Sequence, residues 1–428
     1  MPSYSGVWNL VAVYQAVGAG NWSISPATNW IALIGSGSAD YGTGSAFDSS
    51  GNMYVAASGS KSYLVKISPT GIVSWKKEFN TGWIGGSPNT YNGSIRIDSS
   101  GNIYIFGTWD SSPQQFLLVK LDSNGDILWQ NRVGDASVNS EAYSLSLDAS
   151  GAPIVVGSQN QSGSGAYQFI LKETTAGAVS WATKRGGTTS DYAWSVATDS
   201  SSNVYVGGRT GTGSSSGTIA QYNSSGTIQW GLASSGSFST NTYAMTVSGS
   251  SVYAVQTTSS SRTFLVKTNT SGTVQWQKEL VPSSGTLSGF AADVDSSGNI
   301  YVAGVLNGSP NKGFVAKFNS SGTLLFFNTL QYPASNITIR AIKINGSIMS
   351  ISGWVFISSN DAFSTYFPTD GSATGAYGSF TYASGSASSN SGILSISSDL
   401  LSPGSPSSTL TATTFAVSSS SVSVVRYS

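Results

Sequence analysis

The 428-residue sequence contains no cysteine and no histidine. The absence of cysteine excludes disulfide bonds, thiol nucleophiles and thiolate metal ligands, because each of these requires a sulfhydryl group. The absence of histidine removes the side chain that most often transfers protons near neutral pH and most often binds metals. We therefore expect neither a metal site nor a bound cofactor.

The sequence also contains few charged residues. Only 9% of the residues are charged, whereas about a quarter are charged in an average soluble protein. The 19 basic and 19 acidic side chains give a net charge of zero. Nucleic acids and anionic membranes are bound by basic surfaces, so the composition argues against both partners.

Long apolar runs are also missing. No segment approaches the roughly 18 consecutive apolar residues of a membrane-spanning helix, so no membrane span is expected. The first residues show no basic segment followed by an apolar run, so no secretory signal is expected either.

The sequence does contain a clear repeat. Residues 98–105 read Asp-Ser-Ser-Gly-Asn-Ile-Tyr-Ile, and close copies begin at Asp48 and Asp295. Looser copies begin at residues 148, 199, 248 and 345, so successive copies lie 47 to 51 residues apart. The pattern is typical of a tight hairpin in which Asp caps the turn and Gly or Asn supplies a positive φ. A β-type unit repeated about every 50 residues indicates a propeller or a related array.

A second hairpin follows each of the first six copies. In this hairpin a Gly lies five positions after the first residue, and an aromatic residue lies four positions after the Gly. With two hairpins in each repeat, the sequence predicts an all-β fold, a seven-bladed β-propeller of four-stranded blades. The six copies are Lys66, Gly71 and Trp75; Lys120, Gly125 and Trp129; Lys172, Gly177 and Trp181; Gln221, Gly226 and Trp230; Lys267, Gly272 and Trp276; and Lys317, Gly322 and Phe326.

Three segments are expected along the chain. They are a short helical N-terminal anchor at residues 1–29, the propeller at residues 30–383, and a Ser/Thr-rich, β-type extension at residues 384–428. Residues 30–36 resemble the last strand of a repeat. A strand ahead of the first full repeat is expected to close the ring by joining the last blade, because an unpaired edge strand can pair with other chains and aggregate.

The seventh repeat departs most from the common pattern. It lacks the Lys–Gly–Trp hairpin but still offers four strand candidates. These candidates are residues 337–344, 348–356, 365–368 and 377–382.

The N-terminal segment carries a helical pattern. Apolar residues at positions i, i+3, i+4 and i+7 share one helix face, and this stripe consists of Val7, Leu10, Val11 and Tyr14, with Trp8 beside it. One interpretation is a helix packed against its own propeller. The other is a docking element that anchors the protein in a larger assembly.

Three sets of recurring side chains are candidates for a site. The hairpin Asp residues are interpreted as turn caps, because each turn supplies one carboxylate and calcium needs six or more converging oxygens. The recurring Lys residues alternate with apolar neighbours, which favours a packed stem and a charge directed off the blade. The recurring Trp residues are expected to pack between blades, since no repeat can bury its own face. The sets are Asp48, Asp98, Asp148, Asp199 and Asp295; Lys66, Lys120, Lys172, Lys267 and Lys317; and Trp75, Trp129, Trp181, Trp230 and Trp276.

The two faces of the predicted disc differ. The connections between the first and second strands, and between the third and fourth, are short and uniform, and they share one face. The other connections vary, and variable loops on a rigid scaffold are where recognition normally lies. Aromatic residues gather where these variable loops enter the innermost strands, which suits saccharide or protein binding; the alternative is that they fill the channel mouth as core. They are Trp83, Tyr91, Tyr143, Tyr192, Trp194, Tyr243 and Phe290.

The two recurring hairpins resemble the β-propeller repeats of bacterial extracellular proteins and phage virion proteins. Shorter stretches resemble tail proteins of marine phages, namely Tyr-Ser-Gly-Val-Trp at residues 4–8 and the segment at residues 368–382. The resemblance implies a non-enzymatic, tail- or fibre-associated virion protein that is assembled in the host cytoplasm. Its implied partners are other virion proteins bound through the N-terminal segment, further copies of itself, and a host-surface glycan or receptor.

Two other classes of function stay open. One is a secreted bacterial lectin or adhesin, against which the missing secretory signal counts. The other is an enzyme, because Asp122-Ser-Asn-Gly followed by Trp129 resembles the blade-docking motif of quinoprotein dehydrogenases. That motif is a packing device, and no calcium and quinone constellation accompanies it. Asp293 and Asp295 lie two positions apart in an expected strand, which is more typical of a solvated surface than of a catalytic pair.

Overall fold

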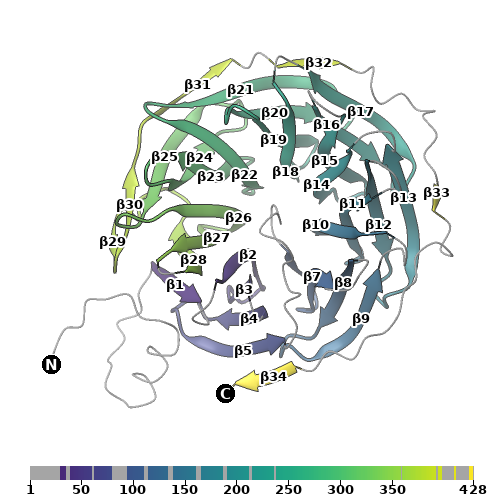
Figure 1. Ribbon diagram of the computed structural model, residues 1–428, viewed down its shortest axis with the longest axis horizontal. Helices are drawn as coiled ribbons and strands as arrows, with labels where there is room; N and C mark the ends of the chain where they lie inside the picture. Colours follow the sequence, from purple (N-terminus) through teal and green to yellow (C-terminus); the bar gives the residue numbers. More distant parts are fainter. Residues whose placement is uncertain are drawn as a thin grey trace.

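The structure, a computed structural model, describes residues 29–34, 39–59, 62–79, 94–109, 114–133, 138–160, 165–186, 190–211, 215–235, 238–357, 359–391, 394–397, 409–410 and 424–427. Their strands form seven sheets around a central axis (Figure 1). In six of these sheets four consecutive strands pair antiparallel, from the centre to the rim. The predicted all-β, seven-bladed propeller of four-stranded blades is confirmed.

The blades follow one another in chain order, and within each blade the chain runs from the innermost strand outward. Blade 1 consists of β2 (Tyr41–Phe47), β3 (Met53–Ser58), β4 (Ser62–Ile67) and β5 (Val73–Phe79); blade 2 of β6 (Ile95–Ile97), β7 (Ile103–Trp109), β8 (Gln115–Leu121) and β9 (Ile127–Val133); blade 3 of β10 (Ser140–Leu147), β11 (Pro153–Asn160), β12 (Ala166–Glu173) and β13 (Val179–Gly186); and blade 4 of β14 (Tyr192–Thr198), β15 (Val204–Thr210), β16 (Ser216–Tyr222) and β17 (Ile228–Ser235). Blade 5 consists of β18 (Thr240–Ser248), β19 (Ser251–Thr258), β20 (Thr263–Asn269) and β21 (Val274–Pro282); blade 6 of β22 (Thr286–Val294), β23 (Ile300–Asn307), β24 (Lys312–Phe318) and β25 (Leu324–Gln331); and blade 7 of β26 (Ile337–Asn345), β27 (Ile348–Phe356) and β28 (Asn360–Pro368), joined by β1 (Trp30–Ile34).

The core lies between the blades. Middle strands contact neighbouring blades on both faces, so most of their residues are buried, and in β3 and β8 every residue is. A strand buried on both faces is apolar without strict alternation. This burial makes each blade a rigid support for the loops at its ends.

The recurring Trp residues join each blade to the next. Trp129 of β9 donates its Nε1–H to the carbonyl of Thr175 in blade 3, at 3.0 Å. A Cβ on Gly177 would lie 3.1 Å from the Trp129 ring, and Gly177 has a φ of +84°. Glycine is therefore required there both for the left-handed backbone and for the ring contact. Equivalent hydrogen bonds run from Trp181 to Ser224, from Trp230 to Thr270 and from Trp276 to Ser320, which confirms the predicted packing between blades.

The ring is closed by β1. This strand pairs with β28 and supplies the fourth strand of blade 7. Trp30 lies opposite Tyr366, as Trp129 lies opposite Lys120 in blade 2, and Trp30 Nε1 donates to the Pro69 carbonyl of blade 1 at 3.1 Å. The predicted closure by residues 30–36 is confirmed for residues 30–34.

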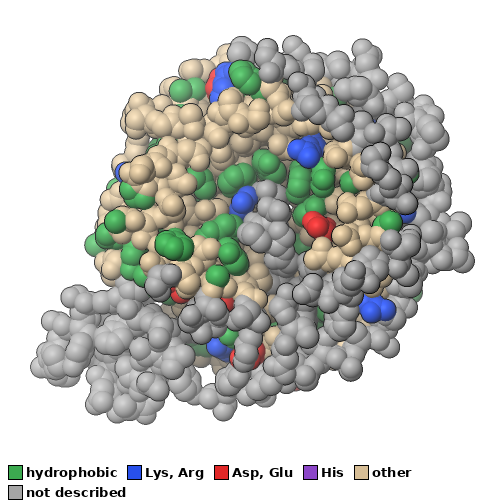
Figure 2. All heavy atoms as spheres, in the orientation of Figure 1, with side chains coloured by type: hydrophobic (Ala, Val, Ile, Leu, Met, Phe, Trp, Pro, Cys, Tyr) green, Lys and Arg blue, Asp and Glu red, His purple; other side chains and the backbone are tan. Residues whose placement is uncertain are grey.

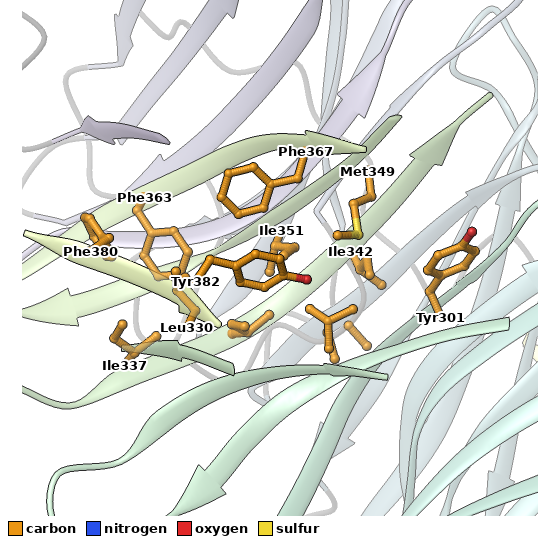
Figure 3. Close-up of a cluster of buried hydrophobic side chains, with 14 of the residues drawn as sticks. Tyr301, Leu330, Ile337, Ile342, Met349, Ile351, Phe363, Phe367, Phe380 and Tyr382 are labelled. Carbon is orange, nitrogen blue, oxygen red and sulfur yellow. The ribbon is translucent and has the colours of Figure 1, made fainter. Parts of the chain in front are cut away.

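The expected fourth strand of the seventh repeat, residues 377–382, is not part of blade 7. The chain instead forms β29 (Gly375–Tyr377) and β30 (Phe380–Ser384), and β30 pairs with β25 at the rim of blade 6. β1 already pairs with the outer edge of β28, so residues 377–382 cannot take the position of the fourth strand in blade 7. Phe380 and Tyr382 are buried beside Phe363 and Phe367 instead (Figure 3).

The tail continues around the rim as additional outer strands. β31 (Ala387–Ser391) pairs with β21, β32 (Ser395–Ser397) with β17, β33 (Thr409–Leu410) with β13, and β34 (Val424–Tyr427) with β5 (Figure 1). The expected β-type character of residues 384–428 as a whole stays a prediction.

The expected N-terminal helix, with Val7, Trp8, Leu10, Val11 and Tyr14, lies outside the described residues. Within the described ranges the chain forms no α-helix, and therefore no helix that could span a membrane.

Candidate functional site

The hairpin Asp residues cap their own turns. Asp48 Oδ1 accepts the backbone N–H groups of Ser50 and Asn52, and Oδ2 accepts from the Asn52 side chain and the Tyr54 hydroxyl, all within 3.1 Å. Partial burial raises the pKa of Asp48, but the bonds from Asn52 and Tyr54 outweigh it and leave this pKa below its ordinary value. The cap interpretation is confirmed, with matching bonds at Asp199 and Asp295. In the part of the chain that the structure describes, no three acidic side chains converge on a possible metal site.

Three of the five recurring Lys residues form hydrogen bonds across the joints between blades. Lys120 Nζ donates to the Thr175 carbonyl of the next blade at 3.1 Å, and only 9% of Lys120 is exposed. Lys317 similarly reaches the Thr369 carbonyl at 3.2 Å. The packed stem is confirmed, but a charge directed off the blade is wrong for these two residues. Each ammonium group is drawn inward because the neighbouring turn offers it a carbonyl oxygen.

Asp293 and Asp295 serve separate partners. Asp295 caps its turn, whereas Asp293 Oδ2 lies 3.3 Å from Lys343 Nζ and accepts the N–H of Ile344 at 2.8 Å. Burial lowers the pKa of Lys343, with Asp293 opposing the shift. The two carboxylates bind different partners and do not pair with each other, but both are half-buried, so the expected solvated surface is wrong for them.

The innermost strands share a β-bulge that recurs at the same position of the repeat. In six blades the pairing of the first two strands skips one residue, five positions before the first residue of the turn. Such a bulge leaves the extra residue unpaired and redirects its side chain. The six residues are Thr43, Tyr143, Trp194, Tyr243, Phe290 and Arg340.

Five of the predicted binding residues form one continuous cluster, which we call the aromatic band. Trp194 is its centre: ring centroids lie 4.4 Å from Tyr143, 4.9 Å from Tyr192 and 5.8 Å from Tyr243. Tyr243 meets Phe290 edge to face at 5.4 Å. The band thus crosses blades 3 to 6, and Figure 2 shows hydrophobic side chains gathered around the central opening. The other two predicted residues, Trp83 and Tyr91, lie outside the described residues.

The residues of the band differ in how deeply they are buried. Tyr143 and Trp194 are only 4% and 9% exposed, so they act as core at the channel mouth. Tyr192, Tyr243 and Phe290 are half-buried and keep part of each ring accessible. Rigid packing below and accessible rings above are what a stacking surface requires.

Charged groups border the band at both ends. The guanidinium of Arg209 lies 4.6 Å from the Tyr192 ring centroid, and that of Arg340 lies 4.1 Å from the Phe290 ring centroid. Tyr143 donates its hydroxyl hydrogen to Glu141 at 2.7 Å. Burial, with the negative charge of Glu141, raises the pKa of Tyr143 far above its ordinary value, so this phenol stays neutral. Sequence reasoning missed Arg340, although it lies five positions before Asn345, as Phe290 does before Asp295.

A groove of about 760 Å³ lies on blade 6, formed by loops of the variable type. Leu306, Pro310 and Tyr332 supply apolar surface, while Asn307 and Lys312 supply polar groups. The Asn307 side-chain amide already donates hydrogen bonds to the Thr286 and Ser288 hydroxyl groups. The aromatic band therefore remains the stronger candidate for recognition.

No family model matches the chain, and no curated protein sequence matches it. Solved structures do resemble it. A protein of unknown function from Bacteroides caccae is 12% identical over 68% of this chain and 93% of that one, with a TM-score of 0.42. The Dos1 propeller is 9% identical over 76% of this chain and 78% of its own, with a TM-score of 0.44. A candidate 6-phosphogluconolactonase from Bacteroides uniformis is 11% identical over 74% and 91%, also with a TM-score of 0.44.

Proposed function

We propose that this protein is a non-enzymatic recognition protein that binds a neutral glycan at the channel mouth through the aromatic band. The observation that carries the proposal is the half-exposed set Tyr192, Tyr243 and Phe290, held in place by buried Trp194 and Tyr143. Aromatic faces stack on the apolar faces of sugar rings, and the low charge of the chain favours a neutral ligand.

We place this activity on a phage virion, in a tail or fibre. The placement is supported by the resemblance of residues 4–8 and 368–382 to marine-phage tail proteins. Several copies on one particle would compensate for weak single sites through avidity. A secreted lectin would use the same binding chemistry, so detection of the protein in purified particles distinguishes the two locations.

The binding proposal is tested with a glycan array and the full-length protein. The double substitution Tyr243→Ala/Phe290→Ala should reduce binding at least about ten-fold, the effect of losing about 1.4 kcal/mol. Asp98→Ala, on the opposite face, should leave binding unchanged. Affinity should differ little between low and high salt, because no phosphate-like charge is involved. If the double variant keeps its fold and binds as tightly as the original, the band is not the recognition surface.

A further inference from the structure

The tail follows the outer rim in the reverse order of the blades. After β30 on blade 6, β31 covers the rim of blade 5 and β32 covers that of blade 4 (Figure 1). Each segment adds a fifth, antiparallel strand to the exposed edge of a fourth strand. Adding a strand to a sheet edge is also how many proteins bind extended peptides.

The tail is firmly anchored at one point. Phe380 is 1% exposed and Tyr382 is fully buried. Both belong to the largest apolar cluster, beside Phe363, Phe367 and Leu330 (Figure 3). Phe380 and Tyr382 therefore attach this part of the chain to the propeller core.

Beyond this anchor the tail is held mainly by its backbone. The side chains of β31 are Ala, Ser and Asn, and all five are exposed or half-buried. Backbone bonds run from Ser283 N–H to Ser386 O at 2.9 Å and from Gly385 N–H to Phe327 O at 2.8 Å. Backbone pairing of this kind fits the same edge in every copy of the protein.

We propose that β31 (Ala387–Ser391) exchanges between copies and pairs with the exposed edge of β21 in a neighbouring propeller. The exchanged and closed forms make the same hydrogen bonds, so only effective concentration separates them. Crowded copies in an assembly therefore favour exchange, while an uncovered rim strand would be an aggregation site. The partner is a second copy of this chain, and the inference is independent of glycan binding.

Cysteine cross-linking tests the exchange, because the natural chain has no cysteine. Lys278 of β21 lies directly opposite Ser391 of β31. Opposite residues in antiparallel strands have Cα atoms about 4.5–5.5 Å apart, within the range that a disulfide bridges. A tagged Lys278→Cys protein is mixed with an untagged Ser391→Cys protein at high concentration and oxidised.

Exchange predicts a disulfide-linked heterodimer, seen at twice the mass of one chain on a non-reducing gel. The matched control replaces Ser391→Cys by Ser388→Cys, whose residue lies opposite Val281 rather than Lys278; this mixture should give at most a small fraction of that heterodimer. The double variant Lys278→Cys/Ser391→Cys verifies that the pair can form a disulfide. Exchange is refuted if the double variant cross-links only within one chain while the mixture yields no heterodimer above the control. A double variant that forms no disulfide at all would overturn the pairing itself.

Discussion

At the scale of single residues, Glu173 is the clearest exception to the repeat. It is fully buried at the end of β12, where β4, β8 and β24 end in Ile67, Leu121 and Phe318. Asn131 Nδ2 donates to its Oε2 at 2.8 Å. Burial raises the pKa of Glu173 from 4.5 to about 7, against the opposing bond from Asn131.

This shift makes stability depend on pH. The unfolded chain ionises Glu173 near 4.5 and the folded chain near 7, so folding stability falls as pH rises across that interval. Glu173→Gln should remove this slope, with little effect below pH 4.5 and a gain of up to about 3 kcal/mol above pH 7. Denaturant unfolding of both proteins at three pH values measures how the free energy of unfolding depends on pH. An unchanged slope in the variant would assign the pH dependence to other groups.

Asp98 provides a second prediction for a single residue. Its Oδ1 accepts the N–H groups of Ser100 and Asn102, and its Oδ2 accepts from the Asn102 side chain, each at 2.9 Å. Asp98→Ala should cost about 1 kcal/mol, the usual effect of losing a capping side chain. Asp98→Asn, which keeps an acceptor, should cost less. A melting temperature that rises with added calcium in the original protein but not in Asp98→Ala would contradict the turn-cap assignment.

At the scale of elements, the joint between β9 and blade 3 depends on Trp129. The Trp129 ring contacts Gly177 and its Nε1–H bonds to Thr175, yet the side chain is half-buried. Trp129→Ala should therefore destabilise by about 2–3 kcal/mol, below the 3–5 kcal/mol of a fully buried aromatic. Trp129→Phe keeps the ring contact and should cost about 1 kcal/mol for the lost hydrogen bond. Equal losses for both variants, measured by denaturant unfolding, would mean that the ring contact contributes little.

At the scale of the whole molecule, truncation near residue 29 separates ring closure from the proposed attachment to a particle. If residues 1–28 serve only as an anchor, a protein that begins at residue 29 and keeps β1 should have the melting temperature of the full chain. A protein that begins at residue 36 lacks β1 and the Trp30 contacts with Pro69 and Tyr366. It should lose at least about 3 kcal/mol, comparable to removing one large aromatic side chain.

The same pair of truncations tests the proposed anchor. If residues 1–28 attach the protein to a virion, the chain that begins at residue 29 should fold normally but be missing from purified particles. Normal incorporation of that shorter chain would refute the anchor without affecting the closure argument.

The sequence by itself determined the repeating part of this protein. Seven hairpin copies predicted seven blades, the Gly and Trp spacing predicted the joints, and residues 30–36 predicted the closing strand. These features are local, because turn capping, positive φ and strand alternation depend on residues within about ten positions of each other. Seven repeats of the first hairpin, six of them followed by the second, then predicted the ring of blades.

Only the tertiary structure decided which edges β29 to β32 pair with and which aromatic side chains meet. Residues 377–382 look like a fourth strand, but β1 competes for the same edge from the other end of the chain and occupies it. Tyr143, Trp194 and Tyr243 lie far apart in sequence, yet Trp194 contacts both Tyr143 and Tyr243, and each of the three is the extra residue of a bulge in its inner strand. Which strand pairs with a given edge, and which inner-strand side chains come together, depend on the closed ring. Neither can be predicted from a single repeat.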